Sequence, residues 1–215
     1  MTTLIKICGL STTEAVASVI AGGGSHLGFI FFPKSPRHVS PEQARDLVSE
    51  VSEAETVAVT VNADNHYLDD IVETMKPTML QLHGGETLER VAEVKARYNL
   101  PIIKALAVRD ADDLKKVYSY DGAVDLLLLD AKPSKDADLP GGNGMTFDWL
   151  LLNGLKTQTP VLLSGGIDLA NVDEAMSRVR DPSNSIQGLD LSSGVESAPG
   201  AKDISKIEAI LAVCI

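Results

Sequence analysis

The chain has 215 residues, of which 44% are hydrophobic, and this length and composition fit one domain with a substantial core. Its 30 acidic and 19 basic residues give a formal net charge of −11. This charge argues against nucleic-acid or anionic-membrane binding, because both depend on surplus lysine and arginine. The N-terminal residues lack a secretory signal pattern, and no apolar run approaches the ~18 residues of a membrane span. With two cysteines, the sequence therefore predicts a cytoplasmic protein with free thiols.

Short apolar runs rich in Val, Ile and Leu alternate with longer stretches of helical period along the chain. We predict strands at Leu4–Cys8, Leu27–Phe32, Thr56–Asn62, Met79–His83, Ile102–Ala107, Asp125–Asp130, Val161–Ser164 and Ile186–Leu191. We predict helices at Thr12–Ala21, Pro41–Ser52, Asn65–Met75, Glu86–Tyr98, Asp110–Tyr120, Phe147–Leu152, Leu169–Val179 and Asp203–Val213. Strands that alternate with helices form right-handed βαβ units and a parallel sheet. Eight such pairs favour a single parallel (β/α)8 barrel domain over residues 1–215, with a doubly wound open sheet as the alternative.

Local signals support some of these boundaries. Ser40 followed by Pro41 is typical of a helix start, and Asp168 is a candidate cap for the helix after the seventh strand. The Pro- and Gly-rich stretch Leu139–Gly144 follows the sixth strand and is predicted to be an active-site loop.

Polar residues interrupt strands that should be apolar on both faces in a parallel barrel. Side chains alternate along a strand, so Lys6 and Cys8 share one face, as do Gln81 and His83. If the uniformly apolar faces pack on the helices, the polar residues face the barrel interior; they are Lys6, Cys8, Gln81, His83, Lys104, Asp130 and Asp190. Most lie near the carboxyl ends of strands, where this fold places its chemistry.

Each of these residues also has a structural interpretation. A cysteine at a strand end is often a small buried hydrophobe, an aspartate caps loops, and a histidine can be a hydrogen-bonded core residue. Lys6 is harder to explain this way, because a buried ammonium group needs a partner. The first and eighth strands are neighbours across the barrel seam, so we predict an ion pair between Lys6 and Asp190.

Two glycine-containing loops indicate a phosphate site. Gly165 and Gly166 follow the seventh strand, and Ser192 and Ser193 follow the eighth. The loops after strands seven and eight commonly form the phosphate site of a (β/α)8 barrel, where glycine lets backbone N–H groups approach an anion. Ordinary turn glycines are the alternative.

The loop after the second strand carries Arg37, which is a candidate for a bidentate contact to a planar carboxylate; a solvated surface arginine is the alternative. Cys214 has no motif around it and is assigned to packing. No cluster of His, Cys and carboxylate residues has metal-site spacing, and no dinucleotide fingerprint follows a strand. The sequence therefore shows no metal-binding or dinucleotide-binding motif.

Together these segments resemble the phosphoribosylanthranilate isomerase family. The matching segments run from end to end: Lys6 to Leu10, Gly28 to Arg37, Val59 to Asn62, Gln81 to Gly84, Leu128 to Asp130, Gly141 to Trp149, Leu163 to Ile167 and Gly188 to Glu196. The resemblance implies an isomerase of tryptophan biosynthesis that acts on a small phosphorylated substrate without a cofactor. Thr60 and Asn143 depart from the family pattern, which usually has an aromatic residue and a threonine there.

The resemblance also implies residue roles. It makes Asp130 the general acid that protonates the furanose ring oxygen and Cys8 the general base that removes the C2 proton. It assigns Arg37 to the anthranilate carboxylate and the loops around Gly165 and Ser192 to the phosphate, while Gln81, His83 and Asp190 are further candidate binding residues. The chain is expected to be a monomer or a homodimer.

As a general base, Cys8 must be a thiolate, and the sequence explains its ionisation only in part. A free thiol with a pKa of ~8.5 is only about 3% thiolate at pH 7. Lys6 lies two residues away on the same strand face and is the candidate that favours the thiolate of Cys8. Asp130 has the opposite requirement, because an acid catalyst must hold its proton near neutrality.

Other phosphosugar barrels are the enzymatic alternatives. Indole-3-glycerol-phosphate synthase should show a catalytic Lys/Glu set and an extension before the first strand, and a ribulose-phosphate epimerase should show metal-binding His and Asp residues. A non-enzymatic barrel that binds phosphorylated ligands would keep the glycine loops without needing Cys8 and Asp130.

Overall fold

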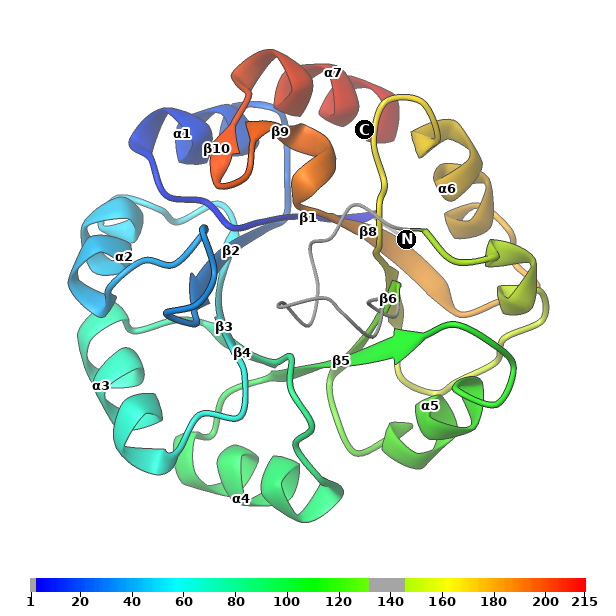
Figure 1. The fold of residues 1–215 in the computed structure, drawn as a ribbon, viewed down its shortest axis with the longest axis horizontal. Helices are drawn as coiled ribbons and strands as arrows, with labels where there is room; N and C mark the ends of the chain where they lie inside the picture. The colour runs from blue at the N-terminus through cyan, green and yellow to red at the C-terminus, as the bar shows by residue number, and fades with distance from the viewer. Residues whose placement is uncertain (1–2, 132–145) are drawn as a thin grey trace.

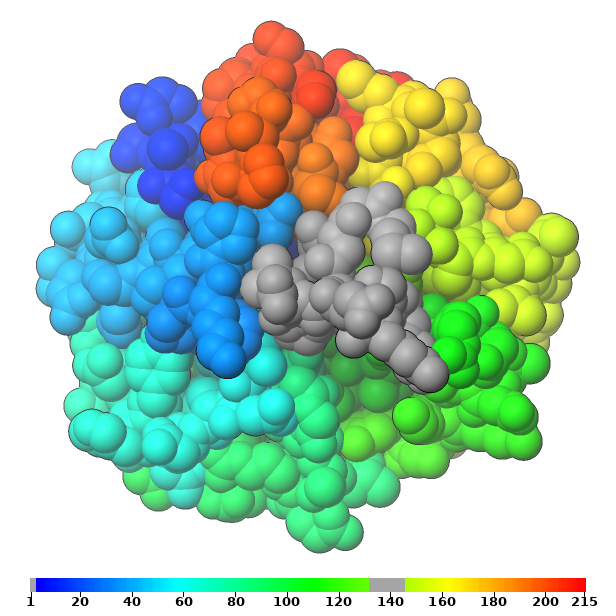
Figure 2. Space-filling model, in the orientation of Figure 1, coloured from blue at the N-terminus to red at the C-terminus, as the bar shows by residue number. Residues whose placement is uncertain are grey.

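A computed structural model describes residues 3–131 and 146–215. Eight parallel strands form a closed barrel in chain order, which confirms the (β/α)8 prediction and rules out the open sheet. Figure 1 shows the barrel end-on, with the helices in a ring around it. In the space-filling view the segments follow one another around the rim of this face in chain order (Figure 2). The predicted loop Leu139–Gly144, with Asn143, lies outside the described residues.

The strands agree closely with the apolar runs of the sequence. They are β1 (Leu4–Cys8), β2 (His26–Phe31), β3 (Glu55–Thr60), β4 (Met79–Leu82), β5 (Ile102–Val108), β6 (Leu126–Ala131), β7 (Val161–Leu163) and β8 (Ile186–Leu191). The barrel closes between β1 and β8, where Lys6 stands beside Asp190. A short antiparallel hairpin that the sequence analysis did not predict, β9 (Glu196–Ala198) and β10 (Ala201–Lys202), follows β8.

The helices are α1 (Thr13–Ala21), α2 (Pro41–Val48), α3 (Asn65–Met75), α4 (Leu88–Tyr98), α5 (Leu114–Tyr120), α6 (Val172–Val179) and α7 (Ile204–Cys214). Two short 3-10 helices, η1 (Trp149–Leu152) and η2 (Ser193–Val195), complete the described elements. The helix predicted at Phe147–Leu152 is therefore wrong in type, because only a single tight turn forms there. In Figure 1, α7 lies between α1 and α6 and completes the ring.

Helix starts follow local side-chain chemistry. Ser40 caps α2 and forms a capping box with Gln43, as the Ser-Pro start predicts. The prediction for Asp168 is wrong, because α6 starts at Val172 and its N-cap is Asn171. The Asp168 carboxylate instead accepts a hydrogen bond from Ala170 N at 2.8 Å, which stabilises a turn before the helix.

Buried apolar residues form two layers. The inner cluster fills the barrel with residues such as Val57, Ile103 and Leu128, and the outer cluster packs the opposite strand faces against the helices. Cys8 belongs to the inner cluster. The interior is thus a packed core, and its polar residues gather where the strands end.

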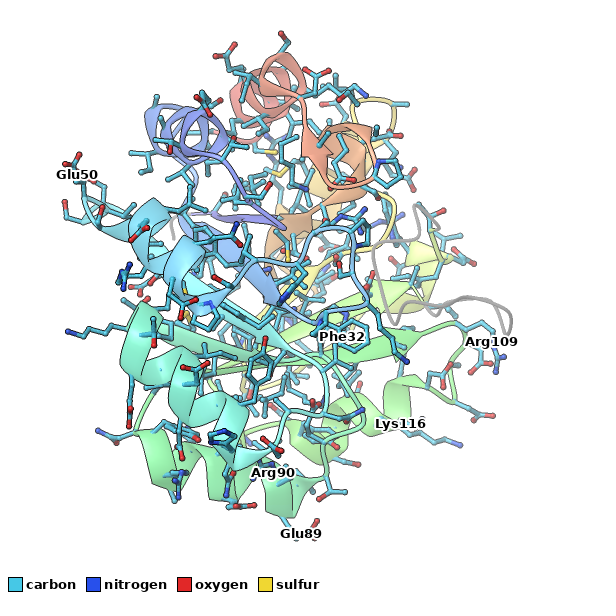
Figure 3. The ribbon with its side chains drawn as sticks, turned by 60° about the vertical axis from the view of Figure 1, so that its left-hand side comes forward. Phe32, Glu50, Glu89, Arg90, Arg109 and Lys116 are labelled. Atoms are coloured by element: carbon cyan, nitrogen blue, oxygen red, sulfur yellow. The ribbon has the colours of Figure 1, made fainter. Side chains whose placement is uncertain are left out.

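The βα loops lie at one end of the barrel, and the loops that follow the helices lie at the other. Figure 3 places Phe32 and Arg109, which follow β2 and β5, on the side opposite Glu50, which follows α2. The former side is where the strands end and the βα loops begin. Within the described residues, no helix is long and apolar enough to cross a membrane.

Candidate active site

The seam between β1 and β8 holds the predicted ion pair. Lys6 Nζ donates to Asp190 Oδ1 at 2.7 Å, and both side chains are buried. Asp190 Oδ2 accepts from the Ser164 hydroxyl at 3.0 Å, so both carboxylate oxygens have donors. Burial opposes the charge of Lys6, but Asp190 and Cys8 outweigh it and raise the pKa of Lys6. Lys6 is therefore a fixed cation inside the barrel.

Cys8 lies at the end of β1 beside that cation. Gly28 of β2 lies next to both groups: a Cβ on Gly28 would be 3.0 Å from Lys6 Nζ and 3.1 Å from Cys8 Sγ. Burial raises the pKa of the Cys8 thiol, and the charge of Lys6 and its hydrogen bond to Cys8 act in the opposite direction. Burial has the larger effect, so Lys6 alone leaves the resting cysteine as a thiol.

The structure adds a second cation, Lys202, which the sequence analysis missed. Lys202 is buried at the end of the β9–β10 hairpin and also acts to lower the pKa of Cys8. Its ammonium donates to Ser192 O at 2.9 Å and to Glu196 Oε1 at 2.8 Å. The Ser192 hydroxyl donates in turn to Cys8 O at 3.0 Å. The hairpin is thus tied to the strand that carries the cysteine.

Asp130 lies on β6 with the same parity as the inner residues Leu126 and Leu128, as predicted. Its Oδ1 accepts from Ala131 N at 2.9 Å, and its Oδ2 is 3.4 Å from His83 Nε2. His83 is the more exposed of the two, with 16% of its side chain accessible against 8% for Asp130. Asp130 and His83 therefore form one unit at the strand ends.

Gln81 fixes the other side of the His83 ring. Gln81 Nε2 and His83 Nδ1 are 2.8 Å apart. With the amide in this orientation, Nε2–H of Gln81 donates to Nδ1 and the imidazole proton lies on Nε2, facing Asp130. The backbone is fixed as well, because His83 N donates to Thr60 O at 2.8 Å. Thr60, which replaces the family's usual aromatic residue, is fully buried, and its hydroxyl donates to Gln81 O at 3.4 Å.

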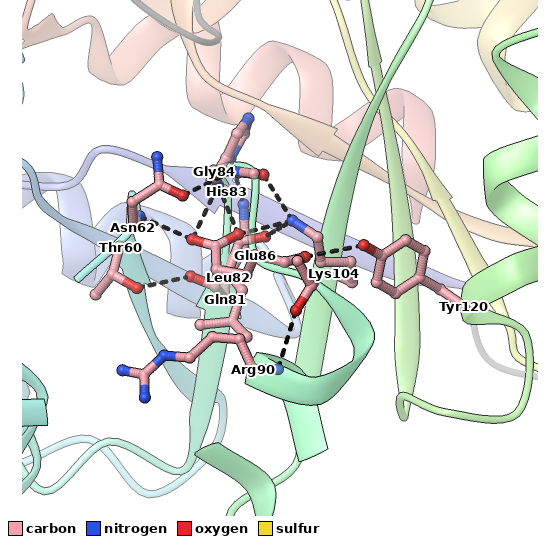
Figure 4. Close-up of polar contacts among 12 residues, drawn as sticks. Thr60, Asn62, Gln81, Leu82, His83, Gly84, Glu86, Arg90, Lys104 and Tyr120 are labelled. Atoms are coloured by element: carbon pink, nitrogen blue, oxygen red, sulfur yellow. Dashed lines mark hydrogen bonds and ion pairs between the residues drawn. The ribbon is translucent and has the colours of Figure 1, made fainter. Parts of the chain in front are cut away.

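Lys104 does not face the barrel interior, so that prediction is wrong. Its strand neighbours Ile103 and Ala105 belong to the inner cluster, which directs Lys104 to the helix side. There it pairs with Glu86 at 2.8 Å, and its ammonium is 6.0 Å from the centre of the Tyr120 ring (Figure 4). The sequence could not show which face Lys104 occupies, because its neighbours on both faces of β5 are apolar. Its partner Glu86 lies in a loop, whose position does not follow from the strand pattern.

Arg37 is a buried residue and not a solvated surface arginine. Its Nε and Nη2 donate to the two carboxylate oxygens of Glu196 at 2.7 and 2.8 Å. The side chain lies over Gly9, since a Cβ there would be 2.7 Å from Arg37 Cδ. Gly9 has a positive φ of 80°, and the missing side chain makes room for the arginine next to the end of β1.

The predicted phosphate loops lie against each other and next to Asp130. Gly165 and Gly166 have positive φ values of 93° and 61°, which favours glycine. A Cβ on Gly165 would be 2.6 Å from Ala131 N, next to Asp130. The loop after β8 in turn lies close to the loop after β7, because a Cβ on Gly194 would be 1.9 Å from Ile167 O. Ser192 and Ser193 are partly exposed at this junction.

The structure therefore groups the predicted residues into one set around Cys8, the predicted base, and another around Asp130, the predicted acid; these sets are called the base side and the acid side below. Glu196 and Lys202 escaped the sequence analysis because their pairing depends on the hairpin. The sequence signal for the hairpin is the dipeptide Pro199-Gly200, which is typical of a turn. In the structure Gly200 has a φ of 86°. Within residues 3–131 and 146–215, no group of three or more His, Cys, Asp and Glu side chains is arranged to hold a metal ion.

Comparison with known proteins gives one consistent match. The family model described as N-(5'phosphoribosyl)anthranilate (PRA) isomerase matches residues 5–213. A relative from Brucella canis, named N-(5'-phosphoribosyl)anthranilate isomerase, is 53% identical over 205 residues, which cover 95% of this chain and 90% of the relative. The crystal structure of the phosphoribosyl anthranilate isomerase from Thermotoga maritima has a TM-score of 0.86 at 31% identity and covers 99% of this chain and 98% of that one. Another isomerase structure, in complex with reduced 1-(o-carboxyphenylamino)-1-deoxyribulose 5-phosphate, has a TM-score of 0.82 at 31% identity, with 97% and 96% covered.

Proposed function

The chain belongs to the N-(5'-phosphoribosyl)anthranilate isomerase family, and on that premise we propose that Cys8 and Asp130 carry the two proton transfers of its reaction. The reaction is the Amadori rearrangement of N-(5-phosphoribosyl)anthranilate to 1-(2-carboxyphenylamino)-1-deoxyribulose 5-phosphate in tryptophan biosynthesis. The observation that carries the proposal is that a buried thiol and a buried carboxyl group occupy separate strand ends of one barrel interior. Each group has a different electrostatic environment, as an acid and a base require.

Asp130 performs the first transfer. Its carboxyl proton goes to the furanose ring oxygen, the bond between that oxygen and C1 breaks, and the nitrogen lone pair forms the Schiff base. Asp130 is only 5% exposed, so little water competes for this proton. The aspartate is left as a carboxylate that faces His83 Nε2 at 3.4 Å.

Cys8 performs the second transfer. Its thiolate takes the proton from C2, the C–H electron pair forms the enolamine, and tautomerisation gives the ketone. Because burial raises the pKa of Cys8, the thiolate depends on the cations at Lys6 and Lys202. The positive charge that develops on the substrate nitrogen is a third favourable charge, which is present only after ring opening.

Arg37 binds the anthranilate carboxylate in this proposal. Glu196 holds the guanidinium through Nε and Nη2, which fixes the orientation of the group that recognises the substrate carboxylate. A guanidinium held by a buried carboxylate loses little side-chain entropy when it binds the substrate.

The phosphate lies over the two loops at the β7 and β8 ends, where Gly165, Gly166, Ser192 and Ser193 offer backbone N–H groups. Asp190 supports this site by holding Lys6 and Ser164. Gln81 and His83 contact the sugar on the acid side. We propose that the enzyme acts in the cytoplasm on this small phosphorylated substrate, as a monomer or a homodimer.

Turnover of N-(5-phosphoribosyl)anthranilate, followed by loss of its anthranilate fluorescence, tests these roles. Cys8→Ala and Asp130→Asn should each lower kcat by at least about 100-fold, the lower end of the range for general acid–base catalysis. Cys214→Ala is the matched control, since Cys214 is a buried cysteine on α7. Full activity in both Cys8→Ala and Asp130→Asn would contradict the proposed mechanism.

A further inference from the structure

The buried pair of Lys104 and Glu86 lies outside the barrel wall and takes no part in the proton transfers above. Lys104 is 1% exposed and Glu86 is 5% exposed. A buried ion pair is often no more stabilising than apolar residues of the same volume. Stability alone therefore does not account for this pair.

The contacts of Lys104 converge on one residue. Lys104 Nζ donates to Leu82 O at 3.0 Å and to Gly84 O at 2.8 Å, the carbonyl groups on either side of His83 (Figure 4). Its third hydrogen bond goes to Glu86 Oε2 at 2.8 Å. All three partners are acceptors, so the ammonium must keep all three protons.

Glu86 fixes the same loop from the other side. Its Oε1 accepts from Asn62 N at 2.8 Å, and its Oε2 accepts from Gly84 N at 2.9 Å. Burial alone would raise the pKa of Glu86, but Lys104 and the backbone donors outweigh it and hold that pKa below its usual value. The Tyr120 hydroxyl donates to Glu86 O at 2.9 Å, which connects α5 to the loop.

We propose that Lys104 and Glu86 are positioning residues that hold His83 in register with Asp130. Lys104 bonds Leu82 O, in the peptide group before His83, and Glu86 accepts from Gly84 N, in the peptide group after it. A shift of the His83 Cα would therefore strain charge-assisted hydrogen bonds on both sides. This inference rests on the proposed roles of Asp130 and His83. With these two residues, the acid side of the site extends from the barrel interior to the helix side of β5.

The distance between His83 and Asp130 explains why support of the His83 backbone matters. The gap of 3.4 Å between His83 Nε2 and Asp130 Oδ2 is longer than a good hydrogen bond, and among the described residues Gln81 holds the other side of the ring. Misplacement of a reacting group by about 1 Å can lower turnover by about 100-fold. A fixed backbone at residue 83 limits that displacement.

The test removes both charges together, because Lys104→Met alone would leave a buried, unpaired carboxylate. In the paired variant Lys104→Met/Glu86→Gln, the amide still accepts hydrogen bonds from the loop. The matched control is Lys95→Met/Asp125→Asn, which removes an ion pair that contacts the other end of β5 through Ile102 N. Each variant is made in the natural sequence and again with His83→Asn, and all are checked by thermal unfolding.

We expect the paired variant to lower kcat about tenfold or more, to change the pH–rate profile, and to shift the imidazole NMR signals of His83. In the His83→Asn background the same pair should cause no further loss, and the control should leave kcat unchanged in both. Equal losses with and without His83, or an unchanged His83 signal, would overturn the inference. If His83→Asn itself has no effect, the inference also fails while the roles of Cys8 and Asp130 stand. Absence of turnover in the natural enzyme would instead contradict the proposed function.

Should the paired variant not fold, Glu86→Gln alone provides the second test. It keeps the carbonyl contacts of Lys104 but weakens the pair. The inference then predicts a smaller loss of kcat that also disappears in the His83→Asn background, and unchanged kcat together with an unchanged His83 signal would overturn it.

Discussion

The base side and the acid side of the barrel use buried charge in different ways. Around Cys8 the cations Lys6, inside the barrel, and Lys202, on the hairpin after β8, act directly on the thiol. Around Asp130 the buried cation is Lys104, which lies on the helix side and is neutralised by Glu86. All three lysines are paired with a carboxylate, so the difference lies in what each ammonium group acts on. A base that must ionise needs positive charge next to it, whereas an acid that must keep its proton is better served by a rigid support away from its carboxyl group. The base side is thus tuned by charge and the acid side by position.

Lys6→Met should have the largest effect on the base side. It leaves the Asp190 carboxylate buried with only Ser164 as a donor, and breaking such a pair costs about 3–5 kcal/mol. Unfolding in urea measures this loss. The paired variant Lys6→Met/Asp190→Asn should recover much of the stability but keep the pKa of Cys8 above that of the natural enzyme, because Lys6 lowers it more than Asp190 raises it.

Ultraviolet absorbance of the thiolate, titrated in a Cys214→Ser background, measures that pKa. Burial raises the pKa of Cys214 itself to about 11, so its removal leaves a single thiol to follow. An unchanged titration of Cys8 in Lys6→Met would show that Lys6 is not its activator.

Glu86→Gln should show its effect in the pH dependence of stability. The pKa of Glu86 is held below its ordinary value of 4.5, so the folded state binds fewer protons on this group than the unfolded chain does. Its contribution to stability is present above about pH 4.5 and is lost as the pH falls through the lower folded value. The natural enzyme should therefore lose stability in acid more steeply than the variant, with a difference of about 1–3 kcal/mol near neutrality. Urea unfolding across this range measures it, and parallel curves would contradict the assignment.

Lys202→Met should give the smallest of these effects. Glu196 keeps its bidentate contact with Arg37, so the carboxylate is not left unpaired, and a loss of about 1 kcal/mol is expected. The pKa of Cys8 should rise, but by less than in Lys6→Met. A larger rise than in Lys6→Met would reverse the order of the two cations.

The sequence was sufficient where a local pattern determines the structure. The apolar runs located the strands, strand parity located Cys8 and Asp130, and neighbouring first and eighth strands predicted the Lys6–Asp190 pair. It was insufficient where a contact depends on a loop. Lys104 faces outward because Glu86 lies outside the wall, and Lys202 reaches the base side only through the unpredicted hairpin. Neither contact follows from periodicity or spacing.

The most direct test of the central claim is the primary kinetic isotope effect on substrate deuterated at C2, measured in Cys8→Ser and Asp130→Asn. If Cys8 removes the C2 proton, that step becomes fully rate-limiting in Cys8→Ser and the isotope effect should be large. If Asp130 opens the ring, ring opening becomes limiting in Asp130→Asn and the isotope effect should fall close to unity. A large effect in Asp130→Asn together with none in Cys8→Ser would contradict the assignment of acid and base.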